Sequence, residues 1–129
     1  MNNPEVHDLH LLRIHDGDTI VCDIEVGMGI WLHDRRIRLA RINAPELPTP
    51  LGVAALNALQ ALIVPQATLT LITTGSEPFD NYGRVLGEVI LYVLPHTAGI
   101  NLSDWLLAHG YAQPWPAPQP IPQLVKETA

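Results

Sequence analysis

Apolar and polar side chains alternate through residues 19–26. One face of this segment carries Ile20, Cys22, Ile24 and Val26, and the other carries Val21, Asp23 and Glu25. A period of two is typical of a half-buried β-strand. An apolar run at residues 9–14 precedes this segment, and the Asp16-Gly17 pair between the two is a turn signal. Together the two segments predict a β-hairpin.

A third strand is predicted over residues 30–42, with an interruption near residues 33–34. The apolar side chains Ile37 and Leu39 alternate with arginines, so the strand has one apolar face and one cationic face. The strand ends before Pro45, because proline cannot donate to a strand ladder and restricts the residue that precedes it.

A helix is predicted after this strand. Thr49 can cap its first turn, and Pro50 suits the first helical position. Apolar residues then recur at helical spacing, at Leu51, Ala55, Leu59 and Leu62. Pro65 closes the helix.

The remaining elements complete a mainly β fold. Residues 67–72 and 85–93 are rich in Leu, Val and Ile and predict two strands, and residues 101–109 predict a second helix with Asn101 as its cap. This order predicts a five-stranded oligonucleotide/oligosaccharide-binding barrel (OB-fold), with a helix between strands 3 and 4 and a C-terminal helix.

The length of 129 residues corresponds to about one domain. We expect an N-terminal extension over residues 1–7, the barrel over residues 8–113, and a tail over residues 114–129 in which alternate prolines favour an extended conformation. Hydrophobic residues make up 47% of the chain. This share is close to that of ordinary globular domains, which argues against disorder of the whole chain.

The formal net charge of −6 argues against non-specific attraction to a phosphate backbone or an anionic membrane. A local cationic patch is nevertheless present, because four of the 7 Lys and Arg residues are Arg35, Arg36, Arg38 and Arg41. No apolar run is long enough to span a bilayer, and the first residues lack a signal-peptide pattern. We expect a cytoplasmic protein, or a secreted one if a leader has been removed, with no membrane partner and a monomer as the favoured state.

Most of the unusual polar residues fall in three predicted turns, at residues 16–19, 38–46 and 80–84. Asp18, Asn43 and Glu46 offer hard oxygen donors, which suit calcium or magnesium. Arg38 and Arg84 offer planar guanidinium groups that suit phosphate oxygens. A hard cation, two arginines and a spare carboxylate are the components that phosphodiester displacement requires.

Three motifs follow one another in the chain with plausible spacing. They are DGDTI at residues 16–20, RIRLARINAPE at residues 36–46 and DNYGRVL at residues 80–86. Each motif alone is weak, but the three in this order resemble the staphylococcal nuclease-like (thermonuclease) family, over about residues 8–113.

The resemblance implies a calcium-dependent nuclease that cuts single-stranded or melted DNA and RNA and leaves 3′-phosphate and 5′-hydroxyl ends. It assigns calcium ligation to Asp18, to the Asn43 position and to the backbone carbonyl of Ala44. The family usually has aspartate where this chain has Asn43. We therefore expect weaker calcium binding, because the amide lacks a charge.

The resemblance also implies the catalytic roles. Glu46 would hold the attacking water as the general base, and Arg38 and Arg84 would grip the scissile phosphate. Tyr82 falls where the family places an aromatic residue that packs along the nucleotide. The family's lysine-rich loop after the Pro-Glu pair is shortened here, and the basic C-terminal helix is replaced by the proline-rich tail, so substrate contacts outside the active site are expected to be fewer.

Plainer interpretations stand beside these assignments. The segment at residues 16–19, taken alone, is more often a hairpin turn than a metal site. Arg35, Arg36 and Arg41 are most simply part of the solvated face of a strand. Trp115 is expected to pack the tail against the barrel. An alternative for the whole chain is a catalytically weak or inactive barrel that binds nucleic acid or protein. Asn43 and the acidic balance favour that alternative, whereas Glu46 and the two arginines oppose it.

Overall fold

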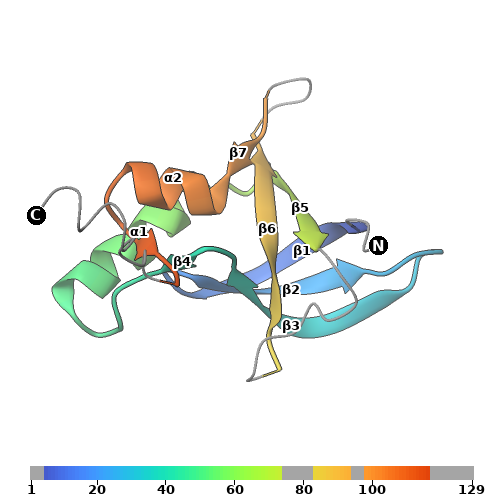
Figure 1. The fold of residues 1–129 in the computed structure, drawn as a ribbon. Helices are drawn as coiled ribbons and strands as arrows, with labels where there is room; N and C mark the ends of the chain where they lie inside the picture. The colour runs from blue at the N-terminus through green and yellow to red at the C-terminus, as the bar shows by residue number, and fades with distance from the viewer. Residues whose placement is uncertain (1–4, 74–82, 94–97, 117–129) are drawn as a thin grey trace, which may run out of the picture.

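The computed structural model describes residues 5–73, 83–93 and 98–116 of the chain (Figure 1). In chain order its elements are β1 (Glu5–Asp16), β2 (Thr19–Glu25), β3 (Trp31–Leu39), β4 (Ile42–Asn43), α1 (Pro50–Leu62), β5 (Thr68–Thr73), β6 (Val85–Tyr92), β7 (Ile100–Asn101), α2 (Leu102–Ala108) and β8 (Gln113–Pro114). Residues 5–7, which we expected in an extension, therefore belong to β1.

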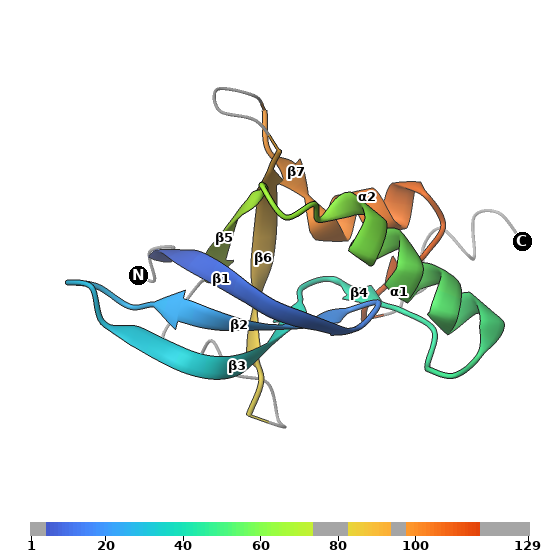
Figure 2. The same ribbon diagram turned by 180° about the vertical axis from the view of Figure 1, so that it is seen from behind.

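Five of the described strands form a closed barrel. β1 pairs antiparallel with β2 and β5, β2 pairs with β3, and β5 pairs with β6. A parallel pairing of β3 with β6 closes the sheet. The predicted fold class is confirmed, since α1 lies in the chain between the third and fourth barrel strands and α2 follows the barrel. Figures 1 and 2 show both helices at the same end of the barrel, away from the tip of the β2–β3 hairpin.

The predicted alternation of β2 holds for its core-facing side chains. Ile20, Cys22 and Ile24 belong to the central apolar cluster of the barrel. Val21, expected on the outer face, is buried as well, and Val26 lies beyond the end of β2 and is 41% exposed.

The interruption expected near residues 33–34 is a bulge within a continuous β3. Asp34 has a left-handed φ of 58°, and the β2–β3 register shifts between Cys22 and Ile24. The backbone N–H of Asp34 donates to the carboxylate of Asp23 at 2.9 Å, which fixes the irregular residue to the neighbouring strand. The bulge lets the strand continue while one residue leaves the ladder.

Helix α1 begins as its sequence predicts. Thr49 is the N-cap, and its Oγ1 accepts a hydrogen bond from the Gly52 N–H at 3.1 Å. The buried face consists of Gly52, Ala55 and Leu59. Leu51, expected on this face, is 71% exposed because it lies at the margin of the face in the first turn.

Helix α2 follows the same rules on a smaller scale. Asn101 caps it by accepting the Asp104 N–H at 3.1 Å, and Gly110 follows its end with a φ of 76°. Trp105 is partly buried against the core and stacks on His109, with ring centroids 4.3 Å apart. Within the described ranges, neither helix is long and apolar enough to cross a membrane.

Cys22 offers a direct test of the integrity of the barrel. Burial, together with the nearby charge of Asp23, raises the pKa of the Cys22 thiol from 9.0 to about 12. A rise of about three units lowers the thiolate fraction at neutral pH about 10³-fold, and the thiolate is the reactive form. We expect a thiol reagent to label the native protein at least about 10³-fold more slowly than the denatured chain. Equal labelling rates would contradict this burial.

Candidate active site

Four segments line a cleft of about 900 Å³. They are the β1–β2 turn, the stretch from the end of β3 to Glu46, the start of β6, and the two residues that follow β8. The predicted site residues that line this cleft are Asp18, Arg38, Asn43, Ala44, Glu46 and Arg84. Tyr82 lies outside the described residues.

Strand register brings these distant positions together. Thr19, next to Asp18, pairs with Arg38 across β2 and β3. Arg38 in turn pairs with Leu86 across the parallel β3–β6 closure, two residues beyond Arg84. Closure of the barrel therefore places described residues of all three motifs at one site.

Asp18 is a buried carboxylate whose oxygens both accept hydrogen bonds. Oδ2 accepts the backbone N–H of Ala44 at 2.9 Å, and Oδ1 accepts the hydroxyl of Thr19 at 3.1 Å. Burial raises the pKa of Asp18, the hydrogen bond from Ala44 opposes this effect, and the neighbouring carboxylate of Asp16 adds to it. Asp18 therefore ties the β1–β2 turn to the segment after β4.

Arg38 is held in place by the protein. Its guanidinium Nη1 donates to the backbone carbonyl of Leu39 at 3.0 Å and lies 3.5 Å from Asp18 Oδ2, while Nη2 donates to Asn43 Oδ1 at 3.3 Å. The residue is only 8% exposed. A guanidinium has five N–H donors, more than the three acceptors in these contacts. The arrangement orients a cation at the cleft and leaves donors for a phosphate.

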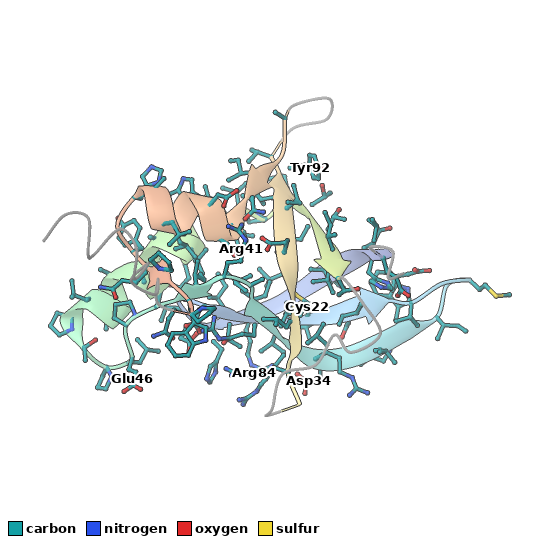
Figure 3. The ribbon with its side chains drawn as sticks, in the orientation of Figure 1. Cys22, Asp34, Arg41, Glu46, Arg84 and Tyr92 are labelled. Carbon is teal, nitrogen blue, oxygen red and sulfur yellow. The ribbon has the colours of Figure 1, made fainter. Side chains whose placement is uncertain are left out.

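Glu46 and Arg84 occupy more open positions. In Figure 3 both lie along the lower edge of the molecule, Glu46 in the loop that leads to α1 and Arg84 at the lower end of β6. Glu46 is exposed and Arg84 is half-buried. A carboxylate on the open side of a cleft can accept a proton from water.

Gly17 allows the β1–β2 turn to approach α1 closely. A methyl group placed at Gly17 would lie 2.7 Å from the Ala55 Cβ and 2.8 Å from the Ala44 Cβ. Real carbon atoms do not approach so closely without displacement. The glycine of the first motif is therefore needed for packing, a role that its turn signal alone did not reveal.

Arg41 is exposed, as expected, but it lies in a turn rather than on the strand face, and its guanidinium is ion-paired. Arg41 lies in the turn after β3 with a φ of 69°, and its guanidinium binds Glu88 through two hydrogen bonds of 2.7 and 2.9 Å. It also donates to Asp104 at 2.8 Å, while Asn101 donates to Glu88 at 3.0 Å. Figure 3 shows Arg41 beneath α2. This ion-pair network joins a wall of the cleft to β6 and α2.

Asp16 and Trp115 are among the cleft residues that the sequence did not assign to the site. Asp16 lines the cleft, and its carboxylate accepts the N–H of Asp18 at 3.0 Å. Trp115 also lines the cleft and is 56% exposed, although its backbone N–H is fixed to the Arg41 carbonyl at 2.8 Å. Residues 113–115 are thus attached to the barrel by backbone contacts, whereas the Trp115 indole is not buried. The position of Asp16 in the first motif was the available signal.

The fold and the cleft define a small OB-fold barrel with a buried carboxylate–arginine pair at a polar cleft. The staphylococcal nuclease homologue family matches residues 36–124, which is more than half of the chain, and the chain belongs to this family. It is also 33% identical, over 111 residues and 78% of its own length, to a protein named Endonuclease YhcR from Bacillus subtilis (strain 168). The chain spans 8% of the length of that relative.

Proposed function

We propose that this protein is a calcium-dependent nuclease that hydrolyses phosphodiester bonds in DNA, RNA or both, leaving 3′-phosphate and 5′-hydroxyl ends. One observation carries the proposal: six predicted site residues from separate segments line a single cleft. Family membership and similarity to a protein named an endonuclease support the same reaction class.

The donor chemistry of the cleft fits calcium. Asp18 and Asn43 supply hard oxygens that contact the two terminal nitrogens of one guanidinium, so both face the same part of the cleft. Among the described residues, no group of three His, Cys, Asp or Glu side chains is placed to hold a metal ion. Calcium accepts six to eight oxygen ligands, including carbonyls and water. We propose that Asp18, Asn43 and the Ala44 carbonyl hold it together with water.

Three side chains of the protein have separate roles in the proposed reaction. Calcium, when bound, would supply positive charge next to the phosphate. Glu46 orients a water molecule and accepts its proton as the water attacks phosphorus. The bond between phosphorus and the 5′ oxygen breaks, and this oxygen takes up a proton from solvent and leaves as the 5′-hydroxyl. Arg38 and Arg84 donate hydrogen bonds to the phosphate oxygens, on which negative charge grows in the transition state. Pre-oriented Arg38 needs little reorganisation for this role because its contacts to Asp18 and Asn43 already fix it.

The direct test is to incubate the protein with end-labelled single-stranded DNA and RNA, with calcium or with a chelator. We expect cleavage with calcium, its loss with chelator, and products that carry 3′-phosphate. Binding of either strand without cleavage would instead support the alternative, an inactive barrel that acts as a binding module. The neutral Asn43 and the net charge of −6 are the observations that favour this second candidate.

Asn43→Asp tests whether the neutral amide weakens calcium binding. Affinity at oxygen-ligand sites rises with the number of charged ligands, and attraction to a divalent ion is stronger in a partly desolvated cleft than in water. We expect half-maximal cleavage at a lower calcium concentration, and tighter calcium binding by calorimetry. Asn57→Asp, on the exposed face of α1, makes the same charge change away from the cleft and should have little effect. Unchanged calcium binding in Asn43→Asp would show that these ligands do not converge on one ion.

A further inference from the structure

We propose that Thr49 and Gly52 are positioning residues for Glu46, and that the first turn of α1 is a fixed mount for the general base. This inference rests on the proposed nuclease function. The mount consists of the hydrogen bonds from the Thr49 backbone and hydroxyl to the Glu46 carbonyl, together with the close approach of Gly52 to that carbonyl. These contacts explain how the exposed carboxylate of Glu46 can accept a proton from a defined position.

Thr49 connects Glu46 to the helix through three hydrogen bonds. Its backbone N–H donates to the Glu46 carbonyl at 3.1 Å, and its Oγ1 donates to the same carbonyl. The same Oγ1 accepts the N–H of Gly52 at 3.1 Å. Capping of the helix and anchoring of Glu46 therefore share one hydroxyl group.

Gly52 allows the close approach that these bonds require. A methyl group placed at Gly52 would overlap the carbonyl oxygen of Glu46, and it would lie 2.7 Å from the Glu46 carbonyl carbon and 2.9 Å from the Pro45 carbonyl oxygen. All of these atoms belong to the backbone, which cannot move aside as the end of a flexible side chain can. Any larger residue at position 52 would displace the backbone of Glu46.

The mount matters because the side chain of Glu46 has little else to define it. The residue is exposed, so the location of its carboxylate depends on the position of its own backbone. A general base acts when it lies within about 2.6–3.2 Å of the proton that it accepts. Displacement of a reacting group by about 1 Å can lower a rate on the order of 10²-fold. Only Leu47 and Pro48 separate Glu46 from Thr49. The first turn of α1 therefore controls the distance between the Glu46 carboxylate and the proton that it accepts.

The variants that test the mount are Thr49→Val, which keeps the shape of the side chain without its hydroxyl, and Gly52→Ala. We expect each to lower kcat about 10- to 100-fold with little change in KM. Thr49→Ser keeps the hydroxyl and should retain most of the activity. Gly29→Ala places a side chain at a left-handed φ of 75° in the β2–β3 turn, a change of similar cost to stability that does not touch Glu46 or the cleft. It should leave kcat nearly unchanged well below its melting temperature.

A double-mutant cycle separates positioning from general damage. If Thr49 acts through Glu46, then Thr49→Val should lower kcat no further in a Glu46→Gln background. NMR relaxation of the Glu46 backbone amide, which needs no substrate, should show larger motion in Thr49→Val and Gly52→Ala than in the wild type or Thr49→Ser.

The outcomes distinguish the two proposals. An active wild type with unchanged kcat in both variants, additive losses in the cycle, or an unchanged Glu46 amide would overturn the mount alone. An inactive wild type would overturn the proposed function and, with it, the catalytic role of the mount, whatever the relaxation data show.

Discussion

Glu46→Gln is expected to lower the turnover of nucleic-acid cleavage by about 10²- to 10⁴-fold, the usual contribution of a positioned base. Glutamine has nearly the same shape as glutamate but cannot accept the proton of the attacking water. The backbone of Glu46 is held by Thr49 independently of the carboxylate, so the loop should keep its conformation. Substrate binding should therefore change far less than turnover, measured at saturating calcium.

Glu5→Gln is the matched control for this substitution. Its side chain is 67% exposed at the start of β1, and the residue is not among those that line the cleft. We expect turnover close to that of the wild type. If Glu46→Gln cleaves as fast as Glu5→Gln, Glu46 is not the base. Asp16 would then be the next candidate, because it lines the cleft and, unlike Asp18, is not paired with Arg38.

The two arginines are expected to differ in what their loss changes. Removing one preorganised donor to a transition-state oxyanion typically lowers a rate about 10²- to 10³-fold, and we expect this for both Arg38→Ala and Arg84→Ala. Arg38→Ala should also destabilise the fold by about 1–3 kcal/mol, because the buried carboxylate of Asp18 loses a partner. Arg84 is more exposed, so its variant should lose rate with a smaller loss of stability.

Single-turnover rates and denaturant unfolding measured on the same samples separate these effects. Arg36→Ala is the control, since Arg36 lies on the same strand as Arg38 but is exposed. Wild-type rates in both Arg38→Ala and Arg84→Ala would remove the arginines from the mechanism. Equal losses of stability in Arg38→Ala and Arg84→Ala would indicate that Arg38 contributes no more than Arg84 to the free energy of unfolding.

The fold could be predicted because local signals agree with the tertiary structure. Periodicity located β2, and the Thr49-Pro50 pair located the start of α1. The parallel closure of β3 with β6 has no local signal, and it was inferred only from the order of the elements. The same limit explains why Leu51 was wrongly expected on the buried face of α1. Helical spacing does not specify which residues at the margin of a helix face are covered by the barrel.

Predicting the site was harder where one side chain is held in place by another. The motifs identified the residues that line the cleft, but they did not indicate that Arg38 is clamped by Asp18 and Asn43. The ion pairs of Arg41 were not predicted because its partners, Glu88 and Asp104, lie 47 and 63 positions further along the chain. Contacts of that range depend on topology. Strand periodicity describes only which face a residue occupies.

The Arg41 network also makes the cleft wall sensitive to acid. Desolvation acts to raise the pKa of Glu88, but the hydrogen bonds from Arg41 and Asn101 outweigh it and hold the pKa below its ordinary value of 4.5. A carboxylate with a lowered pKa stabilises the folded state above its unfolded pKa, and this contribution disappears as the pH falls through the folded pKa. Once the pH falls below the lowered pKa of Glu88, the turn that carries Arg41 would lose its ionised partner on β6. Acid should then loosen the wall next to Trp115 before the apolar core of the barrel opens, so indole fluorescence should change at a higher pH than far-ultraviolet circular dichroism.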